Sequence, residues 1–279
     1  NPFLSLIPFD SNVQRFDITQ NRFIETQKLE AKLDYFYLLN DQSNINLSIG
    51  FTNVAQNYLS DFNQTLDDGT TKSFDDEQFN NNVDFSFKDL YFALNYRIRT
   101  GIFTIDPGLT LHFYDNKNTQ LGQTFAKDIS DIRPNLRVNM QFKKNENLRF
   151  TYRKNTQFTD VNNISEGYVF NNYNSIFRGN RGLEAAIVNS YNLNYRSINQ
   201  FTFTNVYSNI SYSKRENSIQ SRAAIEGINS VRTADNSIFP RETYSARARL
   251  DRRFNNIKIN LSANVRYREF SHIINDVVN

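Results

Sequence analysis

The strict alternation of apolar and polar residues is the feature that most constrains how this chain folds. The clearest example spans residues 257–268, where Ile, Ile, Leu, Ala, Val and Tyr alternate with Lys, Asn, Ser, Asn, Arg and Arg. Successive side chains of a β-strand point to opposite faces, so a period of two over this length predicts a strand between two different media.

The same alternation recurs along the chain, and the connections alternate between short and long. We expect ten strands, at residues 22–39, 44–57, 84–99, 102–115, 130–143, 147–158, 187–198, 201–215, 241–254 and 257–271. Short turns at 40–43, 100–101, 144–146, 199–200 and 255–256 contain residues that favour tight hairpin turns. Longer polar gaps lie at about 58–83, 116–129, 159–186 and 216–240. This pattern predicts an all-β fold, the wall of a transmembrane antiparallel up-and-down β-barrel with short periplasmic turns and long extracellular loops.

Composition agrees with a barrel and excludes several other classes. The 279 residues contain no apolar run of about 20 residues, which excludes a helical membrane protein. A mean hydropathy of −0.62 suits a barrel, because polar lumen residues offset lipid-facing ones. The net charge of +3 is too small to indicate a nucleic-acid partner, and the absence of cysteine excludes disulfides and thiolate metal sites.

The strand count indicates part of a larger barrel. Residues 1–21 show no convincing strand pattern and are expected to belong to a loop, whereas residues 275–279 follow a strand that ends on the extracellular side. Closed bacterial barrels have an even number of strands and periplasmic termini, so we expect at least one further strand. Because the chain shows no signal peptide, we interpret residues 1–279 as a portion of one barrel domain from a longer, exported protein.

The alternation also assigns a lipid-facing side, with outer-membrane lipid as the expected partner. Tyrosines on this side fall near strand ends, where an interfacial aromatic girdle occurs: Tyr35, Tyr96, Tyr152, Tyr195 and Tyr267. The apolar residues of this side are Leu29, Leu33, Ile45, Leu47, Ile49, Leu90, Phe92, Leu94, Leu109, Leu111, Leu136, Val138, Met140, Leu148, Phe150, Leu193, Ala246, Ala248 and Leu250. A soluble β-sandwich is the alternative, although its strands are usually only about 5 to 6 residues long.

A motif at the end of the third long gap carries a family resemblance. Residues 172–184 are followed by an aromatic-rich strand, and Gly179, Asn180 and Leu183 match the Gly-Asn-Pro-x-Leu-Lys-Pro-Glu loop end that TonB-dependent outer-membrane receptors commonly show. The match is partial, because Arg181 stands at the usual first Pro and two alanines replace the Lys-Pro-Glu segment. The strand before this gap also resembles the family's aromatic-x-Tyr-basic strand. The abundance of Asn and Tyr looks most like the Bacteroidota branch.

The resemblance implies a barrel of roughly 22 strands in the outer membrane of a Gram-negative bacterium, with this chain in its C-terminal half. It also implies a plug domain and the TonB system as partners, and it adds a surface lipoprotein as a possible further partner. No plug domain or TonB-binding box is found in these 279 residues, so TonB-driven transport rests on the resemblance.

Arginines crowd the polar faces of the predicted strands. The densest group is on the last two strands: Arg247, Arg249, Arg266 and Arg268. The fixed fork of a guanidinium group suits carboxylates and phosphates, so these residues are candidates to guide an anionic solute or to pair with a plug domain. The alternative is a hydrated barrel interior with arginines paired locally to acids such as Asp251.

Aromatic residues in the long gaps are candidates for solute capture. They stand among small polar residues, a composition that suits contact with sugars or peptides: Tyr58, Phe62, Tyr168, Phe170, Tyr173 and Phe177. These rings can equally pack the loops on one another.

The chain shows no nucleophile elbow, phosphate-binding loop or histidine-rich motif, so no enzyme activity, cofactor or metal is expected. His112 with nearby Asp115, and His272 with nearby Asp276, are too common an arrangement to indicate catalysis. The favoured function is solute uptake by a TonB-dependent receptor-type barrel whose extracellular loops capture the ligand. The alternatives are a surface anchor, secretion component or adhesin, and a passive porin, because a fold does not fix a function.

Overall fold

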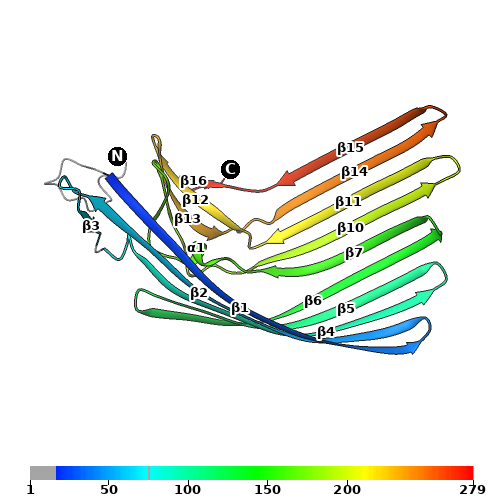
Figure 1. Ribbon diagram of the computed structural model, residues 1–279, viewed down its shortest axis with the longest axis horizontal. Coiled ribbons are helices and arrows are strands. Elements are labelled where there is room, and N and C mark those ends of the chain that lie inside the picture. The colour runs from blue at the N-terminus through cyan, green and yellow to red at the C-terminus, as the bar shows by residue number, and fades with distance from the viewer. Residues whose placement is uncertain (1–16, 75, 279) are drawn as a thin grey trace.

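The computed structural model describes residues 17–74 and 76–278, and ten long strands dominate it (Figure 1). They form one antiparallel sheet in the order β1-β2-β4-β5-β6-β7-β10-β11-β14-β15, so each strand pairs with its neighbour along the chain. Strands β1 and β15 are its two edges, and the sheet is a curved, open part of a barrel wall. The strands are β1 (Asp17–Asn40), β2 (Ser43–Thr65), β4 (Asn81–Thr100), β5 (Phe103–Gln120), β6 (Gln123–Lys143), β7 (Glu146–Gln157), β10 (Ala186–Asn199), β11 (Thr204–Glu216), β14 (Arg241–Phe254) and β15 (Ile257–Glu269).

Five tight turns gather at one end of this sheet, on the right in Figure 1. Gly101 and Asn255 adopt positive φ angles of 55° and 47°, which suits residue types that tolerate the left-handed region. The predicted turn at 199–200 is wrong in detail, because the turn comprises residues 200–203 and β11 begins only at Thr204.

The predicted loop at 116–129 is a β-hairpin. Strands β5 and β6 remain paired up to Gln120 and Gln123, and the turn between them holds Leu121 and Gly122 at φ angles of 51° and 68°. This part of both strands is mostly polar, and its few apolar residues, Phe125, Ala126 and Ile129, are divided between the two faces, so it lacks the alternation by which strands are recognised. The hairpin is therefore a rigid extension of the wall.

The other predicted loops also contain regular structure. Strand β2 runs to Thr65, and β3 (Thr71–Ser73) pairs with it. Residues 159–186 contain α1 (Val161–Ile164), β8 (Val169–Asn172) and β9 (Ser175–Arg178), and residues 216–240 contain β12 (Ile219–Glu226) and β13 (Asn229–Asn236). Residues 17–21, predicted as loop, belong to β1 because they pair with residues 61–65 of β2; residues 1–16 lie outside the described residues.

A second, smaller sheet lies at the end opposite the tight turns (Figure 1). Its order is β17-β16-β12-β13-β9-β8, in which β16 is Ile273–Ile274 and β17 is Val277–Val278. Strand β13 runs parallel to β9, and β12 runs parallel to β16. The sheet thus joins residues 158–185, which we call the third connection, to residues 217–240 and 270–278, although these segments are far apart in sequence. We call these three segments the mouth, together with residues 66–74 and 76–80, whose Phe74 and Phe79 pack against Ile176 of the smaller sheet.

The two faces of the main sheet differ in chemistry, as the alternation predicts. The strand register places every apolar residue predicted to contact lipid on one face, which we call the apolar face. Leu33, Ile49 and Phe92 lie in one row of it and are 69%, 41% and 43% exposed. A sandwich would bury such a face against a second sheet, and none covers it in the described part of the chain. No helix among residues 17–74 and 76–278 has the length and apolar character needed to cross a membrane.

A row of tyrosines marks the mouth end of the apolar face. Five strands contribute one ring each, in direct register, and neighbouring ring centroids are 4.8, 5.8, 4.7 and 6.2 Å apart: Tyr152, Tyr191, Tyr212, Tyr244 and Tyr267. Near the tight turns, the Tyr195 hydroxyl donates a hydrogen bond of 2.8 Å to Glu146. Amphipathic rings at this level suit the boundary between an apolar and an aqueous phase.

Candidate functional site

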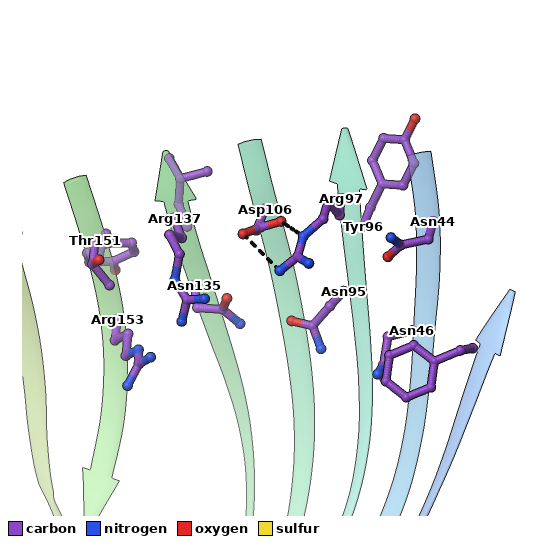
Figure 2. Close-up of a pocket in the computed structure, with 13 residues that line it drawn as sticks. Asn44, Asn46, Asn95, Tyr96, Arg97, Asp106, Asn135, Arg137, Thr151 and Arg153 are labelled. Atoms are coloured by element: carbon purple, nitrogen blue, oxygen red, sulfur yellow. Dashed lines mark hydrogen bonds and ion pairs between the residues drawn. The ribbon is translucent and has the colours of Figure 1, made fainter. Parts of the chain in front are cut away.

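The opposite face, which we call the polar face, presents amide and guanidinium groups across β2, β4, β5, β6 and β7 (Figure 2). Arg97 donates to Asp106 through Nε at 2.5 Å and through Nη2 at 3.4 Å. Arg137 lies directly opposite Asp106 on the next strand. Because charged groups are costly to remove from water, we infer that water contacts this face.

A glycine leaves space for two of these amides between neighbouring strands. A Cβ atom at Gly108 would lie 2.2 Å from Asn95 Oδ1 and 2.5 Å from Asn135 Nδ2. Both asparagines occupy the same level as Gly108 on the neighbouring strands. The absence of a side chain at Gly108 therefore keeps the polar row continuous over three strands (Figure 2).

The four arginines predicted as lumen residues all lie on the polar face. Arg247 and Arg249 are on β14, and Arg266 and Arg268 are on β15. Arg249 pairs with Asp251 at 2.9 Å, which is the local pairing that the alternative interpretation expects. The other three form no ion pair within 4.0 Å among the described residues; the groups opposite them are Asn264, Ser245 and Thr243. Most of this cationic charge is therefore uncompensated.

The mouth folds onto the polar face through its third connection. Tyr58 is 0% exposed and packs with Val83 and Phe85 against Val161 and Ile164 of α1. Hydrogen bonds fix this contact, because Asn81 accepts from the Gly167 backbone N–H at 2.8 Å and donates to the Gly167 carbonyl at 3.2 Å. The Gln120 side chain holds the same segment, donating to the Ile164 carbonyl at 2.9 Å and accepting from the Glu166 N–H at 3.0 Å.

A second cluster of aromatic rings fills the centre of the mouth. Phe62 is 1% exposed, and its ring centroid lies 6.4 Å from Phe74, 5.8 Å from Phe79 and 5.3 Å from Phe170. Tyr168 packs against the same cluster. Its ring lies 5.7 Å from that of Phe79.

These contacts revise the predicted capture residues. Tyr58 and Phe62 are strand residues of β2, not loop residues, and with Tyr168 and Phe170 they pack the mouth together. Buried rings such as Tyr58 and Phe62 present no face to an external ligand in this conformation. Tyr173 is 77% exposed, and Phe177 lines a hollow between the mouth and the wall, so these two remain available for contact.

The hollow was not predicted, because it is formed by segments far apart in sequence. Residues from the ends of β7, β10 and β11, from the α1 segment and from the smaller sheet line it, and most of their side chains are polar: Gln157, Phe158, Thr159, Asp160, Asn163, Phe177, Ala186, Arg215, Ile219, Gln220, Ser221 and Ala234. The hydroxyl of Thr159 is buried and has no hydrogen-bond partner in the described part of the chain.

A buried pair on the polar face differs from the one suggested by sequence. His112 Nδ1 lies 2.9 and 3.0 Å from the carboxylate oxygens of Asp89, and both residues are 9% exposed. Asp115, the nearby acid in the sequence, instead pairs with Lys88 at 3.3 Å. The His112 ring stacks on Tyr114 at 5.2 Å, so the pair is held in a packed environment. Among residues 17–74 and 76–278, no group of three or more His, Cys, Asp or Glu side chains is arranged to hold a metal.

Comparison with known proteins identifies this architecture. A model of the outer membrane protein beta-barrel family matches residues 5–277. The chain belongs to this family. It is therefore a protein of the outer membrane of Gram-negative bacteria, in which the apolar face contacts lipid and the polar face lines the barrel interior.

Solved structures support the same fold. The hemophore receptor HasR of Serratia marcescens aligns with a TM-score of 0.64 at 12% identity, over 90% of this chain and 43% of its own. The ferric citrate transporter FecA gives 0.61 at 11% identity, over 90% and 36%. The FrpB iron transporter of Neisseria meningitidis gives 0.58 at 13% identity, over 89% and 36%. The chain thus spans about two fifths of the length of these barrels or less, and no curated protein sequence matches it.

Proposed function

We propose that this chain forms part of the wall and mouth of a TonB-dependent receptor-type transporter, which imports a solute captured by its extracellular loops. Its fold resembles those of transporters for iron and ferric citrate. The partial Gly179-Asn180 motif of the third connection points the same way.

The observation that carries this proposal is the inward fold of the mouth. Residues 158–183 lie on the polar face, held by Asn81 and Gln120, and they leave a hollow lined by polar side chains at the entrance to the barrel interior. A surface anchor or adhesin needs loops that project into the medium. A mouth packed against the interior wall instead suits the recognition of a solute before it enters.

The partners of this transporter follow from the same interpretation. A plug domain would lie against the polar face, where Arg97, Arg137 and Arg153 offer hydrogen-bond donors (Figure 2). The TonB system would supply the energy for moving the plug, and a surface lipoprotein would deliver the solute. We also propose an origin in the Bacteroidota branch, on the basis of the Asn- and Tyr-rich composition.

An uptake experiment tests the proposal. The gene is deleted in the native bacterium, and depletion of individual solutes from a defined medium is compared between the deletion strain and the strain complemented with the gene. We expect the complemented strain alone to deplete at least one solute, and we expect a proton uncoupler to abolish this depletion. Depletion that persists with the uncoupler, together with a steady open conductance of the purified protein in planar bilayers, would indicate a passive porin instead.

A further inference from the structure

Three guanidinium groups converge where the polar face meets the mouth. Arg215 on β11 lies directly opposite Arg241 on β14, and Arg268 on β15 lies opposite Thr243, two residues from Arg241. The alternation places all three side chains on the polar face. The charges of Arg215 and Arg268 both act unfavourably on that of Arg241, and like charges directly opposite each other destabilise a sheet. We call these three residues the arginine cluster.

No acid of the described chain neutralises the arginine cluster. The acids at the same level, Glu216, Glu242 and Glu269, alternate onto the apolar side of the strands. Glu216 pairs there with Lys214 at 2.7 Å, and Glu242 accepts a hydrogen bond of 2.6 Å from the Tyr244 hydroxyl. Within residues 17–74 and 76–278, none of the three arginines has an ion pair within 4.0 Å. The wall therefore concentrates unpaired positive charge on its inner side.

The arginine cluster also contains a buried N–H group that has no hydrogen-bond acceptor among the described residues. Arg241 Nε is buried and has no hydrogen-bond partner in the described chain. The Arg241 guanidinium carbon lies 5.9 Å from the centre of the Phe270 ring, a contact that limits the orientations of the fork. A buried donor without an acceptor costs free energy, and an anion at this position would supply the acceptor.

Arg215 connects the arginine cluster to the hollow, because its side chain lines that hollow together with Gln157, Asn163 and Gln220. The unpartnered Thr159 hydroxyl lies in the same lining. The carboxylate of Asp160 also lines the hollow, where it accepts a hydrogen bond of 3.1 Å from the backbone N–H of Asn163. With charged forks at one side, and amides, a hydroxyl and this carboxylate at the other, the site suits a ligand with acidic groups at one end and hydroxyl or amide groups at the other.

We propose that the arginine cluster and the adjoining hollow bind an anionic solute through its carboxylate or phosphate groups. This inference rests on the proposed transport function and names the class of its substrate. Arg266 and Arg247, which have no ion pair among the described residues, continue the positive charge along the polar face as far as Arg249, whose charge is paired with Asp251, so the site stands at the start of a cationic path. Planar forks bind carboxylates and phosphates through two parallel hydrogen bonds, which favours these anions over halides.

Titration calorimetry on the intact protein in detergent tests this site, with citrate and pyrophosphate as separate probes and a neutral disaccharide as the reference. We expect the anions to bind, and Arg241→Gln and Arg215→Gln each to weaken binding by about tenfold or more. The Lys variants keep the charge but lose the fork, so they should fall between wild type and the Gln variants. Arg222→Gln is the matched control, because Arg222 lies in the mouth but pairs with Asp276 at 2.9 Å.

Thermal unfolding of the same variants separates binding from structure. Arg215→Gln is the variant to use, because it removes repulsion and Arg215, unlike Arg241, has no cation–π contact among the described residues. Its unfolding temperature should be equal to or above that of wild type while its affinity falls. Unchanged affinity would overturn the proposal. A lowered unfolding temperature of Arg215→Gln would also overturn it, since it would indicate that this arginine pairs with a carboxylate elsewhere in the protein, such as one of a plug. Anion binding without uptake by cells would refute the proposed transport function but support the anion site. Uptake by cells with no anion binding by the purified protein would support transport but refute the anion site.

Discussion

Replacing Phe62 by alanine tests whether the mouth is a packed unit. The ring is 1% exposed and contacts three other aromatic rings at centroid distances between 5.3 and 6.4 Å. Truncation of a buried Phe to Ala costs about 3–5 kcal/mol, because the lost transfer free energy adds to that of the cavity left behind. The backbone hydrogen bonds of the main sheet do not depend on this ring, so the loss of stability should be confined to the mouth.

Hydrogen exchange measures this effect segment by segment. In Phe62→Ala, residues 66–80 and 168–178 should open at least about a hundredfold more often, whereas exchange in β10 and β11 should not change. Tyr173→Ala is the control, because its ring is 77% exposed and its removal should leave protection of the mouth intact. Unchanged protection in Phe62→Ala would refute the packed mouth. Reduced solute affinity with unchanged protection would instead make Phe62 a ligand contact.

Two further substitutions test the third connection and the tyrosine row. Gly179→Ala should detach residues 158–183 and expose them to protease, because its Cβ would lie 2.4 Å from the backbone oxygen of Ser165. Gly182→Ala is the control and should be tolerated, because its Cβ would meet only a side-chain atom, at 3.1 Å. Equal protease resistance of the two variants would contradict this prediction. Tyr212→Ala should lower the free energy of unfolding in lipid by about 1–3 kcal/mol, because its ring stacks on two neighbours, and Tyr267→Ala, with one described neighbour, should cost less. Equal losses of unfolding free energy for the two variants in urea titrations would show that ring stacking does not determine how much each tyrosine stabilises the wall.

The main sheet was predictable because its signal is local. Alternation identified all ten strands and the correct pairing order, and it placed β14 at residues 241–254 as observed. The error at 116–129 has a physical cause. Hydropathy detects a strand through a difference between its two faces, and residues 116–129 of the β5–β6 hairpin show no such difference, because they are mostly polar and their few apolar residues are divided between both faces.

The mouth was beyond such reasoning because its contacts are long-range. Asn81 and Gly167 are 86 residues apart, and the parallel pairing of β13 with β9 joins segments about 55 residues apart. No local period reports such contacts, so Tyr58 and Phe62 appeared as loop aromatics. The arginine cluster was within reach, because the alternation that selected Arg247 also places Arg215 and Arg241 on the polar face.

The central claim is that the two faces of this sheet contact lipid and water respectively, and cysteine scanning tests it most directly. The chain contains no cysteine, so single substitutions at residues 246–249 of β14 can be labelled without background. In lipid bilayers, a charged, membrane-impermeant thiol reagent should label Arg247→Cys and Arg249→Cys and spare Ala246→Cys and Ala248→Cys. Labelling of all four positions, or of 246 and 248 alone, would contradict the account.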